Sequence, residues 1–179
     1  MSRYGLACRK SLGQNFLIDK NIIEKIISAA DLTTADLVVE IGPGLGALTR
    51  PAARSAAGVL AVEVDRGLLP VLAKILEGAG SIEVIEGDAL KIDFDEMVEA
   101  KTGGAYGREG RSYKLLSNIP YAITSPLLIH LLRGRFHFSL MVVMVQLEVA
   151  ARLVAAPGTR DYGALSVAVQ YFAEPEKRS

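Results

Sequence analysis

The sequence predicts an α/β fold in which a mostly parallel sheet is covered by helices on both faces. Short, almost continuously apolar segments alternate along the chain with longer segments of helical character. Strands with such sequences are typical of parallel sheets, because helices bury both faces of the sheet. With 179 residues, half of them hydrophobic, the chain is long enough to bury a sizeable core. We therefore expect residues 1–179 to form one domain.

The first half of the chain gives clear signals for three strands and three helices. Strands are expected at residues 37–41, 59–63 and 82–86. Helices are expected at 19–30, from the glycine-rich segment to about residue 57, and from 65 or 66 through 76. Asp19 is a suitable N-cap for the first of these helices. Pro51 lies within the second and should kink it or shift its start.

The second half continues the alternation after a polar, glycine-rich stretch at residues 91–112, which should hold a short helix and an exposed loop. Strands are expected at 113–117, ending at Asn118, and at 140–146. Helices are expected at 125–132 and 148–155. The apolar pattern of residues 165–172 fits either a strand or a helix.

Four residues suited to ligand binding directly follow or end expected strands. They are Gly42, Glu63, Asp88 and Asn118. Ligands of open parallel sheets bind at the carboxyl ends of the strands. We therefore expect these four residues, which come from separate segments, to meet at one edge of the sheet.

The glycine loop of Gly42, Gly44 and Gly46 lets the backbone turn tightly and approach a ligand closely. An ordinary strand-to-helix turn is the alternative, and with Ala47 the loop also satisfies the relaxed dinucleotide-binding pattern. Glu63, about 20 residues further on, can accept both ribose hydroxyls of a nucleoside or can be a solvated residue at the sheet edge. These two features do not distinguish NAD from S-adenosylmethionine.

The segment Asn118-Ile119-Pro120-Tyr121 is more specific. The exocyclic amine of adenine is a poor nucleophile, because its lone pair is delocalised into the ring. An Asn oxygen and a backbone carbonyl can accept its two hydrogens and so direct the lone pair at a methyl donor, while Tyr121 can stack on a flipped-out base. A polar turn with a core tyrosine is the alternative. Asp88 can accept a hydrogen bond from the cofactor's adenine amine or can cap a helix.

Composition restricts the other classes of function. Lysine and arginine balance aspartate and glutamate at 20 each, so any RNA-binding surface must be local. We expect no metal site, a cytoplasmic location and no membrane segment, since Cys8 is the single cysteine and no apolar run is long enough. His130 is expected to pack in a helix. Candidate RNA contacts are the basic N-terminal segment with Arg9 and Lys10, and the basic, aromatic loop 133–138.

Seven segments together resemble the ribosomal RNA adenine N(6)-dimethyltransferase family, especially its housekeeping small-subunit branch. They are Ser11–Leu17, Glu40–Gly46, Glu63–Asp65, Gly87–Ala89, Asn118–Tyr121, Gln146–Ala150 and Asp161–Gly163. The resemblance implies a Rossmann-like class I S-adenosylmethionine-dependent methyltransferase fold. It also implies dimethylation of two adjacent adenosines in the RNA of the small ribosomal subunit, with S-adenosylmethionine as cofactor and S-adenosylhomocysteine as product.

The resemblance assigns roles to individual residues. The implied cofactor-binding residues are Asn15, Leu17, Gly42, Gly44, Glu63, Asp88, Ala89 and Asn118. The implied catalytic residues are Asn118, Pro120 and Tyr121. The implied RNA contacts are Arg9, Lys10, Arg135 and Phe138, with Phe138 as a second base-stacking partner. Residues 1–18 form a segment that contacts cofactor and RNA, and a monomer is expected.

Three features depart from the family. Pro51 is unexpected in its helix, and Leu147 stands where a basic residue is common. Family members continue beyond the position of Ser179 with a β-hairpin and a helical C-terminal domain, so the chain is expected to be truncated. In that case residues 165–172 are a helix, and the strand at 140–146 is an unpaired sheet edge.

Three other functions remain open. A methyltransferase of the macrolide-resistance type, acting on large-subunit RNA, shares the Asn118–Tyr121 motif. An rRNA assembly factor that binds cofactor with little turnover keeps the same fold. A nicotinamide oxidoreductase fits the glycine loop but gives no reason for the Asn118–Tyr121 motif.

Overall fold

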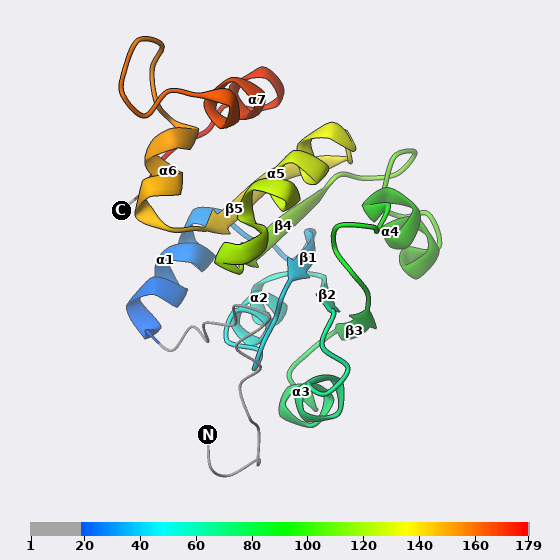
Figure 1. Cartoon of the computed structure of the whole chain (residues 1–179). Coiled ribbons are helices and arrows are strands. Elements are labelled where there is room, and N and C mark those ends of the chain that lie inside the picture. Colours follow the sequence, from blue (N-terminus) through cyan, green and yellow to red (C-terminus); the bar gives the residue numbers. More distant parts are fainter. Residues whose placement is uncertain (1–18, 179) are drawn as a thin grey trace.

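The computed structural model describes residues 19–178 and confirms the expected α/β fold (Figure 1). Five parallel strands form one sheet in the order β3-β2-β1-β4-β5. The strands are β1 (Leu37–Ile41), β2 (Gly58–Glu63), β3 (Ile82–Glu86), β4 (Tyr113–Asn118) and β5 (Phe138–Met144). The helices are α1 (Lys20–Ala30), α2 (Thr49–Ser55), α3 (Leu69–Leu76), α4 (Phe94–Thr102), α5 (Thr124–Arg133), α6 (Leu147–Leu153) and α7 (Ala164–Phe172), with a 3₁₀ turn η3 (Tyr121–Ile123) before α5.

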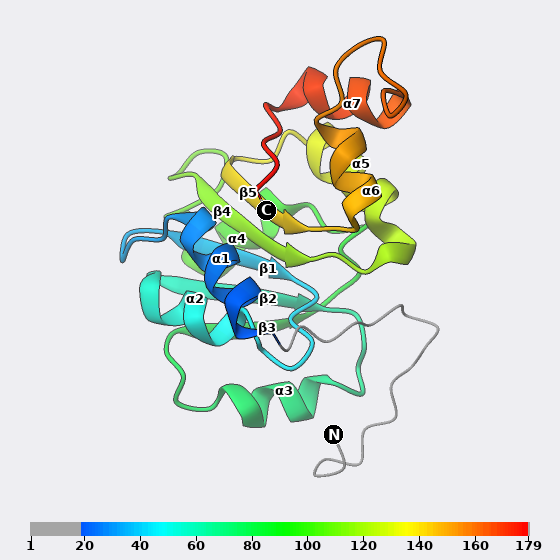
Figure 2. The same ribbon diagram turned by 90° about the vertical axis from the view of Figure 1, so that its left-hand side faces the viewer.

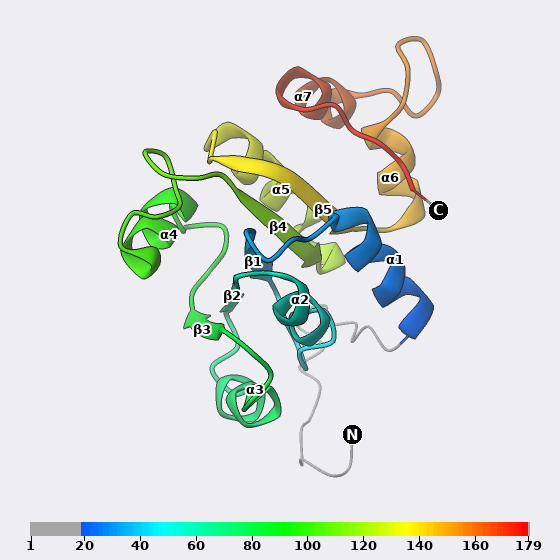
Figure 3. The ribbon, with the colours of Figure 1, turned by 180° about the vertical axis from the view of Figure 1, so that it is seen from behind.

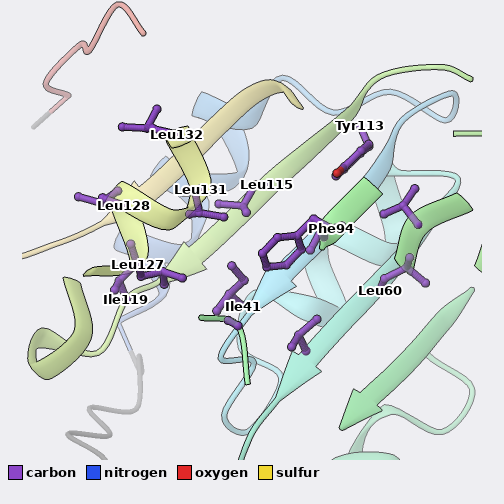
Figure 4. Close-up of a cluster of buried hydrophobic side chains, with 14 of the residues drawn as sticks. Ile41, Leu60, Phe94, Tyr113, Leu115, Ile119, Leu127, Leu128, Leu131 and Leu132 are labelled. Carbon is purple, nitrogen blue, oxygen red and sulfur yellow. The ribbon is translucent and has the colours of Figure 1, made fainter. Parts of the chain in front are cut away.

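Helices cover both faces of the sheet, as Figures 1 and 3 show. The side chains of α1 and α2 pack with Val38, Val59 and Leu116 on one face. On the other face a larger cluster joins α4 and α5 to the strands, with Phe94 fully buried among its members (Figure 4). All residues of β1 and β2 are buried, which explains why these strands are almost continuously apolar in sequence.

Two proline-containing helices begin later than a continuous helical pattern would suggest. α2 begins at Thr49, so Pro51 falls in its first turn, where a backbone N–H has no partner within the helix. The expectation that Pro51 shifts the start of this helix is therefore confirmed. α3 begins at Leu69 and not at 65 or 66, with Pro70 in its first turn. The Asp65 carboxylate instead accepts a hydrogen bond from the Gly67 amide at 2.9 Å and forms a separate turn.

The last strand and the last helix are the elements for which the sequence pattern is least decisive. β5 spans residues 138–144 and not 140–146, because Phe138 pairs with Tyr113 at the start of β4. The ambiguous segment 165–172 lies within the helix α7, as the family resemblance implies. Among the described residues no strand pairs with the outer side of β5, which is therefore a sheet edge.

The strand order places the candidate site. β1 is flanked by β2 on one side and β4 on the other, so the order of connection reverses between β1 and β4. Ligands of such sheets bind where this reversal occurs, at the carboxyl ends of the strands. Figure 2 shows that all strands point towards the same edge of the sheet. No helix between residues 19 and 178 has the length and apolar character needed to cross a membrane.

Candidate functional site

The carboxyl ends of the strands are joined by a series of hydrogen bonds. The Gly42 amide donates to the Val62 carbonyl at 3.0 Å, and the Gly87 amide donates to the Glu63 carbonyl at 3.0 Å. On the other side of β1, the Ser117 hydroxyl donates to the Ile41 carbonyl at 2.8 Å. The expectation that four strand ends meet at one edge of the sheet is therefore confirmed. Three strand spacings separate β3 from β4, about 14 Å, so the edge suits an elongated ligand.

The glycines of the loop after β1 serve different purposes. Gly42 has φ +70°, and a Cβ atom added there would meet no atom of residues 19–178 within 4 Å. Gly46 has φ +77°, and an added Cβ would lie 2.8 Å from Leu76 Cδ2 in α3. Gly42 thus leaves open space beside the backbone, where a ligand can approach, whereas Gly46 allows the loop to pack closely on α3. Gly44 also has positive φ, at +58°.

Glu63 ends β2 with its carboxylate held in place from several sides. Its Oε1 accepts a hydrogen bond from the Asp65 amide at 2.9 Å, and the residue is only 4% exposed. Burial raises the pKa of this carboxyl group, while the amides of Asp65, Val64 and Gly44 oppose the shift. The interaction with Gly44 brings Glu63 next to the glycine loop. A carboxylate oriented in this way is suited to accept hydroxyl hydrogen bonds from a ligand.

Asp88 and Ala89 follow β3 at the other end of the site. The Asp88 Oδ1 accepts a hydrogen bond from the Leu90 amide at 3.1 Å, and Lys91 Nζ lies 3.3 Å from Oδ2. The next helix, α4, is capped by Asp93. The alternative that Asp88 caps that helix is therefore wrong, and its half-buried carboxylate retains acceptor capacity. Ala89 is buried in the core.

Asn118, Pro120 and Tyr121 lie at the end of β4, beside the reversal in strand order. Asn118 is half-buried and pairs in register with Met144 of β5. Pro120 leads into η3, and Tyr121 is 53% exposed. The alternative that Tyr121 is a core side chain is therefore wrong. Its ring stands outside the core and lies at the same edge as Asn118.

Two candidate RNA contacts lie at the opposite end of the sheet. Phe138 begins β5, six residues and about 20 Å before Met144. Its ring centroid lies 4.8 Å from that of Tyr113 and 6.0 Å from that of Phe94. The expectation that Phe138 stacks on the same base as Tyr121 is therefore wrong, because strand pairing places it in an aromatic cluster at the amino ends. The exposed Arg135 lies in the loop just before it, away from the strand ends of the site.

The remaining candidates divide into two groups. His130 is half-buried and packs against Phe94 and Phe136, as expected, with Nε2 2.9 Å from the Ile92 carbonyl oxygen. Asn15, Leu17, Arg9 and Lys10 lie outside the described residues. In the described part of the chain, no cluster of three or more His, Cys, Asp or Glu side chains could hold a metal ion.

Glu40 is a buried carboxyl group to which the sequence motifs assign no individual role. It is 2% exposed, and neither its Oε2 nor the nearby Thr49 Oγ1 has a hydrogen-bond partner of good geometry among the described residues. Burial raises the pKa of Glu40 to about 7, the Thr49 side chain opposes the shift, and the charge of Glu63 adds to it. A lone acidic residue in the apolar segment Leu37–Ile41 is the sequence signal that identifies it.

Glu40 is expected to make the stability of the protein depend on pH. Between pH 4.5 and about 7 the folded protein keeps a proton on Glu40 that the unfolded chain releases. Stability from this group is therefore complete below pH 4.5 and is lost as the pH rises through about 7. The full difference is about 3 kcal/mol at most.

Urea unfolding of the wild type and Glu40→Gln at pH 5 and pH 8 measures this effect. As the pH is raised from 5 to 8, the free energy of unfolding of the wild type should fall by up to about 3 kcal/mol more than that of Glu40→Gln. The exposed Glu83, changed to Gln, is the control and should leave the pH dependence of the wild type intact. Parallel pH profiles for the wild type and Glu40→Gln would contradict the assignment.

Comparison with known proteins gives consistent matches. The family model described as ribosomal RNA adenine dimethylase matches residues 5–177. The chain is 71% identical over 176 residues to ribosomal RNA small subunit methyltransferase A of Pelotomaculum thermopropionicum, covering 98% of this chain and 60% of the relative. It is 52% identical to the protein of the same name from Moorella thermoacetica, covering 96% of this chain and 59% of that relative. The chain thus spans about 60% of the length of these curated relatives.

Two solved structures resemble the fold and retain substantial sequence identity. A dimethyladenosine transferase from Plasmodium falciparum matches with a TM-score of 0.71 and 33% identity, over 87% of this chain and 52% of the other. The 23S rRNA methyltransferase ErmE matches with a TM-score of 0.63 and 30% identity, over 80% of this chain and 53% of the other.

Proposed function

Because the chain belongs to the ribosomal RNA adenine dimethylase family, we propose that it carries the methyl-transfer site of an rRNA adenine dimethyltransferase. The proposed reaction transfers methyl groups from S-adenosylmethionine to the exocyclic amines of two adjacent adenosines in small-subunit rRNA. The observation that carries the proposal is the meeting of Gly42, Glu63, Asp88 and Asn118 at one edge of the sheet, next to the reversal in strand order. The name of the 71% identical relative supports the small subunit as the source of the substrate.

The residues at this edge fit S-adenosylmethionine. The open space at Gly42 accommodates the methionine part, and the oriented Glu63 carboxylate accepts hydrogen bonds from the two ribose hydroxyls. Asp88 accepts from the adenine amine, beside Ala89, while Gly44 and Asn118 complete the described part of the cofactor set. We further propose that Asn15 and Leu17 contact the cofactor from the N-terminal segment 1–18. When bound, the cofactor supplies an electrophilic methyl group on a sulfonium sulfur.

Asn118 prepares the amine for attack. Its side-chain oxygen and a backbone carbonyl of the Asn118–Tyr121 turn accept the two amine hydrogens, which localises the nitrogen lone pair. With the cofactor bound, a C–N bond would form as the C–S bond breaks, and the proton would then pass from the cationic nitrogen to water, since it becomes acidic only after attack. No strong general base is needed, so the site acts by positioning and polarisation. Pro120 stiffens the turn and has no amide hydrogen to compete, and the exposed Tyr121 stacks on the extruded base.

We also propose that residues 1–179 act as one catalytic domain, that the protein is a cytoplasmic monomer, and that Arg9, Lys10 and Arg135 contact RNA phosphates. Arg135 lies at the amino ends of the strands, so this contact would be separate from the catalytic pocket.

A methyl-transfer assay on small ribosomal subunits that lack the modification tests the function. We expect S-adenosylmethionine-dependent labelling that maps to two adjacent adenosines as dimethyladenosine. Naked large-subunit RNA serves as the comparison substrate, and preferential labelling of it would favour the macrolide-resistance type. Calorimetry with S-adenosylmethionine and with NAD accompanies the assay. Cofactor binding without any transfer would favour an assembly factor, and NAD binding alone would overturn the proposal.

A further inference from the structure

We propose that Ser117 is a positioning residue for methyl transfer, because its hydroxyl links the strand that carries Asn118 to the strand that leads into the glycine loop. This inference rests on the proposed function. Ser117 does not touch the reacting atoms in this role. It acts by holding Asn118, which contacts the target amine, in position relative to the glycine loop, which contacts the methyl donor.

The hydrogen bond joins the two backbone positions that directly precede Asn118 and Gly42. Ser117 Oγ donates to the Ile41 carbonyl oxygen at 2.8 Å, and the two residues are directly paired in the parallel register of β4 and β1. Ile41 immediately precedes Gly42, and Ser117 immediately precedes Asn118. One hydrogen bond therefore connects the residue before the cofactor loop to the residue before the catalytic side chain.

The position of this link in the sheet is significant. β1 and β4 flank the reversal in strand order. From β1 the chain continues to β2 and β3 on one side, and β4 and β5 lie on the other side. At the other strand junctions the ends are tied by backbone amides, such as Gly42 to Val62 and Ile119 to Met144. Between β1 and β4 the Ser117 side chain contributes in addition, as the Glu63 side chain does between β2 and the glycine loop through the Gly44 amide, so this junction depends on which amino acid is present.

Burial makes the hydrogen bond directional and persistent. Ser117 is 0% exposed, so water cannot readily replace its partner. Methyl transfer is sensitive to such a constraint, because the amine must approach the methyl carbon closely and in line. A misplacement of about 1 Å can reduce a rate about 10²-fold.

A purely structural role for Ser117 is the competing explanation, and the chain offers a matched control for it. Ser166 is also 0% exposed, and its hydroxyl donates to the Arg152 carbonyl oxygen at 2.6 Å. This bond joins α7 to α6, away from the strand ends of the site. Its loss in Ser166→Ala should reduce stability without changing the distance between the cofactor loop and Asn118.

The test compares Ser117→Ala, Ser117→Cys and Ser166→Ala with the wild type. In Ser117→Ala we expect kcat to fall roughly 10- to 100-fold, with the Kd for S-adenosylmethionine and the KM for RNA within about threefold. Cysteine retains a weak donor of similar size, so Ser117→Cys should recover part of the loss. Ser166→Ala should lose at least as much thermal stability while keeping kcat within about twofold of the wild type.

A second measurement does not depend on turnover. In ¹H–¹⁵N spectra of the cofactor-free protein, Ser117→Ala should shift the Gly42 backbone amide and the Asn118 side-chain amide, whereas Ser166→Ala should leave both unchanged. Unchanged resonances in Ser117→Ala, or a kcat equal to that of Ser166→Ala, would overturn the inference. If the wild type transfers no methyl group, the proposed function fails for this chain, and the spectra still decide whether Ser117 positions these two residues.

Discussion

Replacement of Asn118 by alanine should lower the rate of methyl transfer roughly 10³-fold or more, while S-adenosylmethionine still binds. Alanine cannot accept the hydrogens of the target amine, so the lone pair stays delocalised into the adenine ring. Loss of one preorganised polar group at a reacting centre costs about 10²- to 10³-fold, and the weak nucleophilicity of this amine places the effect at the upper end. Single-turnover transfer to unmodified small subunits measures the rate, and calorimetry measures cofactor binding.

Asn21→Ala is the matched control for this experiment. Asn21 is exposed in the first turn of α1 and belongs to neither the proposed cofactor-binding nor the proposed catalytic set, so its removal should change neither the transfer rate nor the Kd for S-adenosylmethionine. Because Asn118 also belongs to the proposed cofactor set, a modest increase in the Kd is compatible with its role. Transfer at the wild-type rate by Asn118→Ala would show that the amine is activated by another group. Complete loss of cofactor binding would show instead that Asn118 acts mainly in holding the methyl donor.

Most of the strands can be predicted from sequence, because a buried strand is an almost continuous run of apolar residues. The segments at residues 37–41 and 82–86 are the strands β1 and β3 without any shift. The predicted position of β5 is wrong by two residues, since the polar Ser139 interrupts the apolar run and Phe138 joins the sheet only through its partner Tyr113. The predicted start of α3 is too early, because the Asp65 turn resembles a helix start in sequence.

The candidate site is predictable where a residue's role follows from its place at a strand end. Gly42, Glu63, Asp88 and Asn118 can be located in this way, since the carboxyl ends of parallel strands must lie at one edge. Ser117 cannot be recognised from sequence, because its role depends on the cross-strand register that pairs it with Ile41. The prediction for Phe138 fails for a related reason, since it is the register of β5 with β4 that places its ring against Tyr113.

Glu63 is expected to dominate the affinity for the cofactor. Its carboxylate can accept both ribose hydroxyls, and each hydrogen bond to a charged group contributes about 1.5–3 kcal/mol. Glu63→Ala should therefore raise the Kd for S-adenosylmethionine at least about 10²-fold, and Glu63→Gln, which keeps the shape but not the charge, about 10-fold. Calorimetry measures both values, and kcat at saturating cofactor should change far less than the Kd.

Glu86 provides the control, because it pairs with Glu63 in the register of β2 and β3 but is exposed and bound to Arg66 at 2.6 Å. Glu86→Gln should bind cofactor like the wild type.

Measurements of stability separate a binding role from a folding role for Glu63. Burial raises the pKa of its carboxyl group, so the charged form costs stability at neutral pH, and Glu63→Gln should be at least as stable as the wild type. If binding weakens while stability is undiminished, the carboxylate acts through its hydrogen bonds to the cofactor, whereas unchanged binding by Glu63→Ala would place the ribose elsewhere.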